Sequence, residues 1–212
     1  MLILLVDTCL AVCQAALVRN GIVLAAMSEP MVRGHQERVA PMVREVLAAA
    51  KVRLVDVDRI AVTLGPGSFT GLRVGLAFAK GLALALDRPC VGVGTLEALA
   101  ASEEGGGLCV AAIDAGRGAI YLQFFDGDHE LTGPDRLPVE TAAARIVEIG
   151  PGQRLIGPQA SAFAPALPSV LPTDLAAPSP LAIARLAAKA PLIRPRPLYL
   201  HAPDAKIKLA PA

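Results

Sequence analysis

The segment from Gly65 to Gly71, with the sequence GPGSFTG, has the composition of a loop that could bind phosphate. Gly-rich turns ahead of a helix bind anions through their backbone N–H groups. A Walker loop also requires Gly-Lys-Ser/Thr, and a dinucleotide loop requires a third glycine where Thr70 stands. Neither pattern is present, and Ser68 does not lie in the G-x-S-x-G sequence of a hydrolase nucleophile. The segment therefore predicts a tight strand-to-helix turn, capped by Ser68 or Thr70, or part of a protein interface.

Two acidic residues, Asp7 and Asp114, each end an apolar run that predicts a buried strand. In two-lobed ATPases of the actin and sugar-kinase type, an acid at this place orients magnesium and water beside the phosphates, and small residues follow it. The residues after Asp7 (TCLA) are bulky and apolar, whereas those after Asp114 (AGRG) are mostly small. Two interpretations stay open: the acids cap local turns, or they are candidate cofactor-binding residues of a degenerate nucleotide site. We expect no cofactor.

A metallopeptidase or iron site would need a second histidine four residues after His35, and that position holds Val39. The other two histidines stand alone in the sequence, and the cysteines show no C-x-x-C spacing; they are Cys9, Cys13, Cys90 and Cys109. We therefore expect no metal site, no disulfide framework and no catalytic residue. His35 is interpreted as a structural residue at the start of a helix.

The charge of the chain is nearly balanced, with 20 basic and 19 acidic residues among 212. Proteins that bind nucleic acid alone usually carry a strong basic excess, so any RNA contact should be weak and shared with another protein. Basic residues gather near the C-terminus, at Arg194, Arg196, Lys206 and Lys208.

Apolar residues make up 54% of the chain, and the mean hydropathy is +0.53. No charge-free apolar run reaches about 18 residues, and the first residues lack the pattern of a signal peptide. We therefore expect a cytoplasmic protein that does not enter the membrane. Its apolar surplus is expected partly in the core and partly in a protein interface.

Short apolar runs alternate with amphipathic segments and predict an α/β chain of two lobes. Asn20-Gly21 predicts a β-hairpin, and helices are predicted at about 36–51, 72–86, 139–149 and 181–190. After the polar break 103–107 (EEGGG), the opening order of strand, acidic residue and strand recurs. We predict an N-terminal lobe over 1–103, which carries the partner-binding helices, and a smaller C-terminal lobe over 108–212 with an irregular Pro-rich tail.

The predicted helix 72–86 is apolar on nearly every side, with Arg73 and Lys80 as its only ionisable residues. A helix of this kind is buried nearly all round, so one side is expected to cover a sheet and the other to meet a partner. Gly71, Gly75 and Ala79 recur every four residues and would let a partner helix approach closely. The predicted partner interface comprises Gly71, Leu72, Arg73, Gly75, Leu76, Ala79 and Lys80, with Val39 and Val43 of the preceding helix. The alternative is a central helix packed entirely within this chain.

The chain resembles the TsaB family, formerly called YeaZ, in four segments that occur in the family's order and spacing. These are Asp7-Thr8, residues 35–43 (HQERVAPMV), residues 65–73 (GPGSFTGLR) and residues 113–121 (IDAGRGAIY). Tyr199-Leu200 is also similar to the family's ending. The resemblance covers nearly the whole chain and is best over residues 1–125, and GPGSFTGLR is its most specific segment.

The resemblance implies a two-lobed actin/Hsp70-like fold with duplicated RNase H-like lobes. It also implies a non-catalytic subunit that binds TsaD, the paralogue that carries a metal and transfers a threonylcarbamoyl group to adenosine 37 of tRNA. The ATPase TsaE joins this pair, tRNA is reached through the complex, and the free protein could form a homodimer. The alternative is an ATP-dependent kinase or a peptidase-like enzyme of the same superfamily.

One departure from the family concerns the turn after Asp114. The family usually has Asp-Ala-Arg there, whereas this chain has Gly116 in the third position and Arg117 one residue later. A role of the family's arginine is therefore not carried over to this chain.

Overall fold

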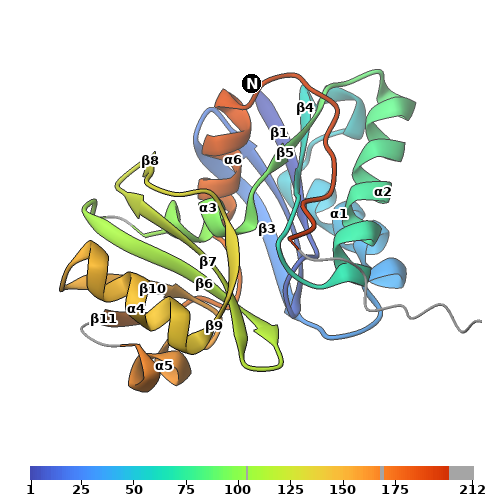
Figure 1. The fold of residues 1–212 in the computed structure, drawn as a ribbon. Helices are drawn as coiled ribbons and strands as arrows, with labels where there is room; N and C mark the ends of the chain where they lie inside the picture. Colours follow the sequence, from blue (N-terminus) through green and yellow to red (C-terminus); the bar gives the residue numbers. More distant parts are fainter. Residues whose placement is uncertain (104, 168–169, 201–212) are drawn as a thin grey trace, which may run out of the picture.

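Two α/β lobes lie side by side in the computed structural model, which describes residues 1–103, 105–167 and 170–200 (Figure 1). The predicted basic residues Lys206 and Lys208 lie outside the described residues. The first sheet has the strand order β3-β2-β1-β4-β5. Its strands are β1 (Leu2–Asp7), β2 (Val12–Arg19), β3 (Ile22–Pro30), β4 (Arg59–Thr63) and β5 (Cys90–Val93).

Strand β1 is central to this sheet, antiparallel to β2 and parallel to β4. All six of its residues are buried, which explains why the run before Asp7 is continuously apolar instead of alternating. The predicted hairpin is confirmed, because Asn20 and Gly21 both adopt positive φ, 50° and 81°, as a two-residue turn between twisted strands requires.

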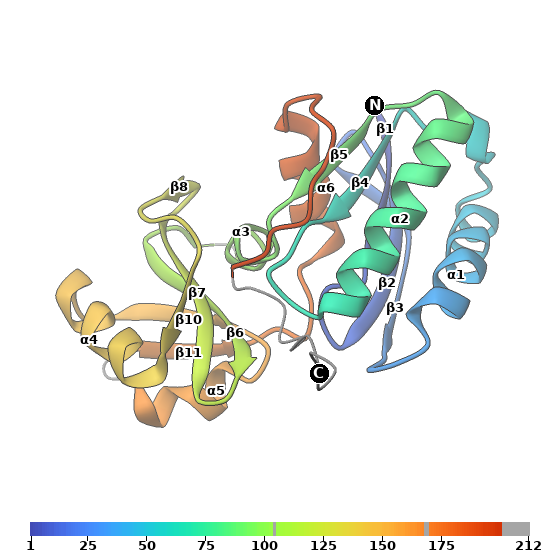
Figure 2. The same ribbon diagram turned by 45° about the vertical axis from the view of Figure 1, so that its right-hand side comes forward.

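Helices cover both faces of the first sheet (Figure 2). Helices α1 (His35–Ala50) and α2 (Phe69–Leu86) enclose one core cluster with the sheet. Helix α6 (Pro180–Lys189) covers the opposite face and encloses a second cluster. A short 3₁₀ turn, Leu54–Asp56, precedes β4, and α3 (Thr95–Ala100) leads toward the second lobe.

The second sheet repeats the topology of the first, with the order β11-β10-β6-β7-β8 and β9 also paired to β7. Its elements are β6 (Leu108–Gly116), β7 (Ala119–Asp126), β8 (His129–Glu130), β9 (Asp135–Pro138), α4 (Val139–Ile149), β10 (Gln153–Gly157), α5 (Ala160–Phe163), a 3₁₀ turn at Ala164–Ala166 and β11 (Val170–Asp174). Here β6 pairs antiparallel with β7 and parallel with β10, as β1 does with β2 and β4. The predicted duplicated, two-lobed actin/Hsp70-like fold is confirmed.

The predicted C-terminal boundary of the lobes needs correction. The sequence predicts a second lobe over 108–212, but Ile183 and Ala187 of α6 pack in the core of the first sheet. The following residues also return to the first lobe, where the Leu198 amide donates to the Leu64 carbonyl at 2.8 Å. The cause is the open face of the first sheet, which α1 and α2 leave uncovered and the apolar side of α6 buries.

The predicted partner interface also needs correction, because most of its residues lie in the chain's own core. Five of the predicted interface residues on α2 are buried within the chain: Gly71, Leu72, Gly75, Leu76 and Ala79. Val39 and Val43 of α1 are buried in one core cluster with Leu76 and Ala79. A Cβ at Gly71 would collide with the Thr8 carbonyl oxygen, and one at Gly75 with the Thr8 hydroxyl. The small residues therefore admit the end of β1, not a partner helix.

Helix α2 is also long and apolar enough to cross a membrane if length and composition alone are considered. Core helices of globular proteins satisfy the same criteria. In this fold, Leu76, Ala79 and Ala83 of α2 pack in the core cluster against the sheet, and this packing accounts for the apolar composition of that face.

Two alanine substitutions in α2 should have opposite effects on stability. Gly71→Ala places a methyl group against backbone and should lower the free energy of unfolding by about 1–3 kcal/mol. Gly81→Ala should raise it by about 0.5–1 kcal/mol, because a Cβ there meets no atom within 4 Å and alanine favours helix. Urea unfolding of both variants measures the difference, and equal stability of the two would contradict this packing.

Candidate functional site

The turn after β1 is a buried polar region of the first lobe. Asp7 is 1% exposed, and its Oδ1 accepts from the Thr63 hydroxyl at 2.6 Å and from the Cys9 amide at 2.9 Å. Its Oδ2 has no partner among the described residues. The carboxyl group thus holds the ends of two neighbouring strands together.

Burial sets the protonation behaviour of this turn. It raises the pKa of the Asp7 carboxyl above its ordinary value of 3.8, against the hydrogen bonds from Thr63 and the Cys9 amide, which lower it. Burial, and secondarily the Asp7 carboxylate, raises the pKa of the Cys9 thiol to about 12. A thiol with this pKa is not a nucleophile at neutral pH. Cys9 is therefore a packing residue.

The loop from Gly65 to Gly71 packs directly on this turn. The Ser68 amide donates to the Cys9 carbonyl at 2.7 Å, and the Thr8 hydroxyl donates to the Gly71 carbonyl at 2.6 Å. A Cβ at Gly67 would collide with the Cys9 carbonyl oxygen. The predicted cap is confirmed at Ser68, whose Oγ accepts from the Gly71 amide at 3.2 Å. The glycines thus allow close packing of backbone on backbone, and they leave no cradle for phosphate between loop and turn.

A cleft of about 310 Å³ separates the lobes beside this loop. Its walls are mainly apolar, with Leu10 and Val32 on one side and Ile113 on the other. Asp114 is exposed in this cleft, and its Oδ1 accepts from the Gly116 amide at 2.8 Å. None of the described lining residues is lysine or arginine. The cleft therefore offers a triphosphate one carboxylate and no compensating positive side chain.

The structure does not bring the two candidate nucleotide residues together. Asp7 is buried behind the loop and does not line the cleft, whereas Asp114 does. Both acids hold local turns through the amide two residues later, Cys9 and Gly116 respectively. This is the capping role, one of the two interpretations that the sequence leaves open.

The start of α1 holds the residues considered for a metal site. His35 is 6% exposed, and its Nε2 has no partner among the described residues. Val39, at the position of the required second histidine, is buried in the core. The described residues contain no group of three or more side chains suited to hold a metal ion.

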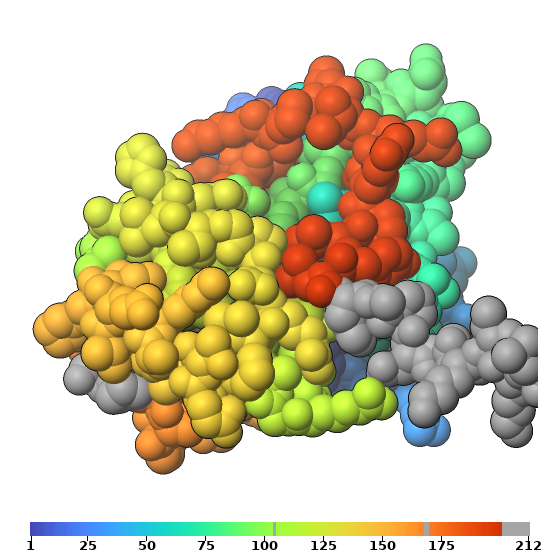
Figure 3. Space-filling view, viewed as in Figure 1, coloured from blue at the N-terminus to red at the C-terminus, as the bar shows by residue number. Residues whose placement is uncertain are grey.

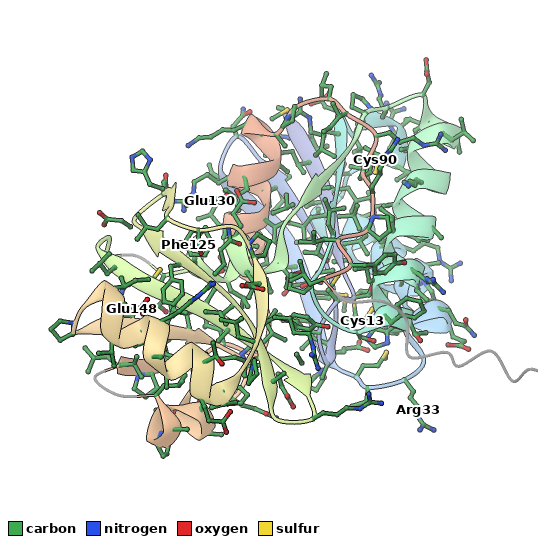
Figure 4. All side chains as sticks on the ribbon, in the orientation of Figure 1. Cys13, Arg33, Cys90, Phe125, Glu130 and Glu148 are labelled. Atoms are coloured by element: carbon green, nitrogen blue, oxygen red, sulfur yellow. The ribbon has the colours of Figure 1, made fainter. Side chains whose placement is uncertain are left out.

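The cysteines are distributed through the fold and do not form a cluster. Cys13 and Cys90 lie toward opposite ends of the first sheet (Figure 4). All four cysteines are free thiols.

The outer side of α2 carries the remaining residues of the predicted interface. Arg73 is exposed, Lys80 is half-buried, and Gly81 and Leu84 face outward beside them. The Leu84 side chain is 85% exposed, an unusual position for a large apolar residue in a helix. Helix α2 therefore exposes apolar residues on the side opposite the sheet. These residues are not the predicted stripe of Gly71, Gly75 and Ala79, which is buried.

A stack of Phe69, Arg73 and Tyr199 was not predicted. The Arg73 guanidinium carbon lies 3.6 Å from the Phe69 ring centroid and 5.8 Å from that of Tyr199. Arg73 Nε also donates to the Tyr199 hydroxyl at 3.0 Å. The chain has five phenylalanines, two tyrosines and no tryptophan. This scarcity of aromatic residues is the sequence feature that could have drawn attention to Phe69 and Tyr199.

The chain is similar to proteins of one tRNA modification system. The family model described as "TsaD: tRNA N6-adenosine threonylcarbamoyltransferase" matches residues 27–151. Over 131 residues the chain is 39% identical to the "tRNA threonylcarbamoyladenosine biosynthesis protein TsaB" of Escherichia coli (strain K12). That match covers 60% of this chain and 56% of the relative, so it spans little more than half of the relative's length.

Other relatives match along nearly the full length. "Uncharacterized protein Rv3421c" of Mycobacterium tuberculosis is 35% identical over 207 residues, which cover 96% of this chain and 93% of that protein. The solved structure "YeaZ from Pseudomonas aeruginosa" superposes with a TM-score of 0.80 at 27% identity. It covers 94% of this chain and 99% of its own.

Replacement of Asp7 by asparagine should change how stability depends on pH. Burial raises the pKa of Asp7 in the folded chain, so the folded state binds more protons than the unfolded state above the ordinary pKa. The free energy of unfolding of the wild type therefore falls as the pH rises through this interval. Asparagine does not titrate, so Asp7→Asn should gain stability relative to the wild type as the pH rises.

Urea unfolding at several pH values from about 4 to 8 measures this difference. A constant difference between the two proteins over that range would contradict the raised pKa.

Proposed function

This chain belongs to the TsaB (YeaZ) family, and on that premise we propose that it is a non-catalytic subunit in the formation of N6-threonylcarbamoyladenosine in tRNA. Its proposed role is to bind and activate TsaD, the paralogue that performs the transfer. The lack of a cationic side chain among the described cleft-lining residues supports this role, as does the buried Val39 at the position of a metal-binding histidine.

The proposed docking site for TsaD is the outer face of α2. The main support for this site is the glycine at position 81. A glycine inside a helix costs roughly 1 kcal/mol relative to alanine. A Cβ at Gly81 would have no atom within 4 Å, so packing inside this chain does not require a glycine there. Close approach of a second helix explains it.

The residues around Gly81 fit the same proposal. Ala77 and Leu84, about one turn away on either side, are exposed, and the three together form an apolar strip. Stable interfaces between subunits resemble a protein core cut in half, and Leu84 would supply the large buried side chain of such an interface.

The wider assembly follows from the same family membership. We propose that TsaE is the third protein of the complex and that tRNA is bound mainly through TsaD. Without TsaD, the strip on α2 would pair two copies of this chain about a two-fold axis. The proposed location is the cytoplasm, where tRNA modification takes place.

Leu84→Glu should prevent binding to TsaD without unfolding the chain. The carboxylate would be buried without a partner at a cost of several kcal/mol, which corresponds to a loss of affinity of about 100-fold or more. The measurement is co-elution with TsaD in size-exclusion chromatography, together with circular dichroism of the free variant.

Val147→Glu is the matched control, since Val147 is a 63% exposed apolar residue on α4 in the other lobe. It should co-elute normally. Normal co-elution of Leu84→Glu would show that another face binds TsaD.

The isolated chain should neither bind ATP tightly nor hydrolyse it, because the described walls of the cleft hold no side chain that offsets the phosphate charge. Calorimetric titration with ATP and magnesium should detect no dissociation constant below about 1 mM. Binding of ATP with a micromolar dissociation constant, lost in the Asp114→Asn variant, would instead support a kinase-like enzyme.

A further inference from the structure

The last described residues, 191–200, form an extended strap along the first lobe. Prolines at 195 and 197 hold Arg194 and Arg196 in extended conformations, because a residue before proline avoids the helical region. Pro195 is buried, while both arginines are exposed. The strap (red in Figure 3) lies on the surface and borders a hollow beside the second lobe.

The two arginines of the strap are available for a ligand. Neither forms a hydrogen bond or an ion pair with any described residue. Two other arginines of the first lobe do form ion pairs: Arg38 pairs with Glu29 and Glu45, and Arg53 pairs with Asp56. The arginines also line a hollow of about 510 Å³ against Leu64 and Gly92 of the first lobe.

The strap ends at the stack of Phe69, Arg73 and Tyr199. The two rings lie 5.4 Å apart, and both are substantially exposed, Phe69 at 40% and Tyr199 at 44%. Leu198 anchors the strap here through its hydrogen bond to the Leu64 carbonyl. Three residues of extended chain separate Arg196 from Tyr199, about 9 Å. The strap therefore connects two exposed guanidinium groups, those of Arg194 and Arg196, to the stack of two rings and Arg73.

We propose that this surface, formed by the strap and the first turn of α2, binds single-stranded RNA. Arg194 and Arg196 bind phosphates, and the exposed rings with the Arg73 guanidinium stack on unpaired bases. This proposal rests on the proposed function, because that function is the reason to expect an RNA ligand. The N6 amino group of adenosine takes part in base pairing, so an unpaired adenosine in a single-stranded segment presents this group most fully for acylation.

The chemistry of the surface favours RNA over an acidic protein segment. Arginine alone would suit either polyanion. Exposed rings beside unpaired guanidinium groups suit bases that alternate with phosphates, because every base offers a flat face. With few cationic contacts, the surface assists binding by a complex and does not replace the main RNA site, in keeping with the nearly balanced charge of the chain.

The test is a fluorescence anisotropy titration of the complex with TsaD, and of the free chain, against labelled RNA. The probes are an RNA hairpin with an adenosine-containing loop and a fully paired RNA of equal length. Arg194→Gln with Arg196→Gln should weaken hairpin binding about 10- to 30-fold near 0.1 M salt and reduce the salt slope by about 1.4. Tyr199→Ala should weaken hairpin binding at least about fivefold with an unchanged salt slope.

The control removes two exposed charges elsewhere in the same lobe, Arg19→Gln with Lys51→Gln, and should leave binding nearly unchanged. Equal affinity of the strap variant and the wild type at all salt concentrations would overturn the proposal. If the strap variant lost affinity equally for the paired RNA and the hairpin, and Tyr199→Ala had no effect, the proposed preference for single-stranded RNA would be wrong.

Two further outcomes separate this inference from the proposed function. If the strap variant no longer co-elutes with TsaD but the free chain keeps its RNA affinity, the strap binds protein and the proposal is wrong. If the wild-type chain fails to pair with TsaD, the proposed function fails, while the titration of the free chain still decides the RNA proposal.

Discussion

The contact between the end of β1 and the start of α2 is the constraint on which the first lobe depends. Backbone meets backbone there: the Ser68 amide donates to the Cys9 carbonyl, and the Thr8 hydroxyl donates to the Gly71 carbonyl. Gly-rich turns ahead of a helix can hold phosphate where space remains beside their backbone N–H groups. Here the chain fills that space with its own atoms, so the glycines serve packing.

Because of this packing, α2 has an inner face that is buried within the chain and an outer face that is exposed. Its inner face is fully used by the sheet, and any partner of the helix must therefore meet the outer face. Glycines occur on both faces for different reasons, since Gly71 has no room for a methyl group and Gly81 has open space around it. The close packing of the loop on β1 and the exposed apolar outer face are thus both features of the same helix.

The sequence is sufficient to predict the elements and the duplicated order of strands. Buried central strands are continuously apolar, and the α1 stripe has the helical period, so these patterns alone predict that Leu4 and Val46 lie in the core, where both are fully buried. The sequence does not reveal which face of α2 meets the sheet, because α2 is apolar on nearly all sides. Nor does it show that α6 crosses back to the first sheet, since a helix pattern does not specify the sheet that it covers.

Arg73 joins the two proposed surfaces. It lies on α2, four residues before Ala77 of the apolar strip, and it stacks on Phe69 and bonds to Tyr199 of the strap. A protein seated on the outer face of α2 and an RNA strand on the strap would therefore meet at the same guanidinium group. Because Leu198 fixes the strap to the loop that also packs on β1, displacement of α2 by a partner would move the stack as well. The position of the strap therefore provides a physical route by which partner binding would alter RNA contact.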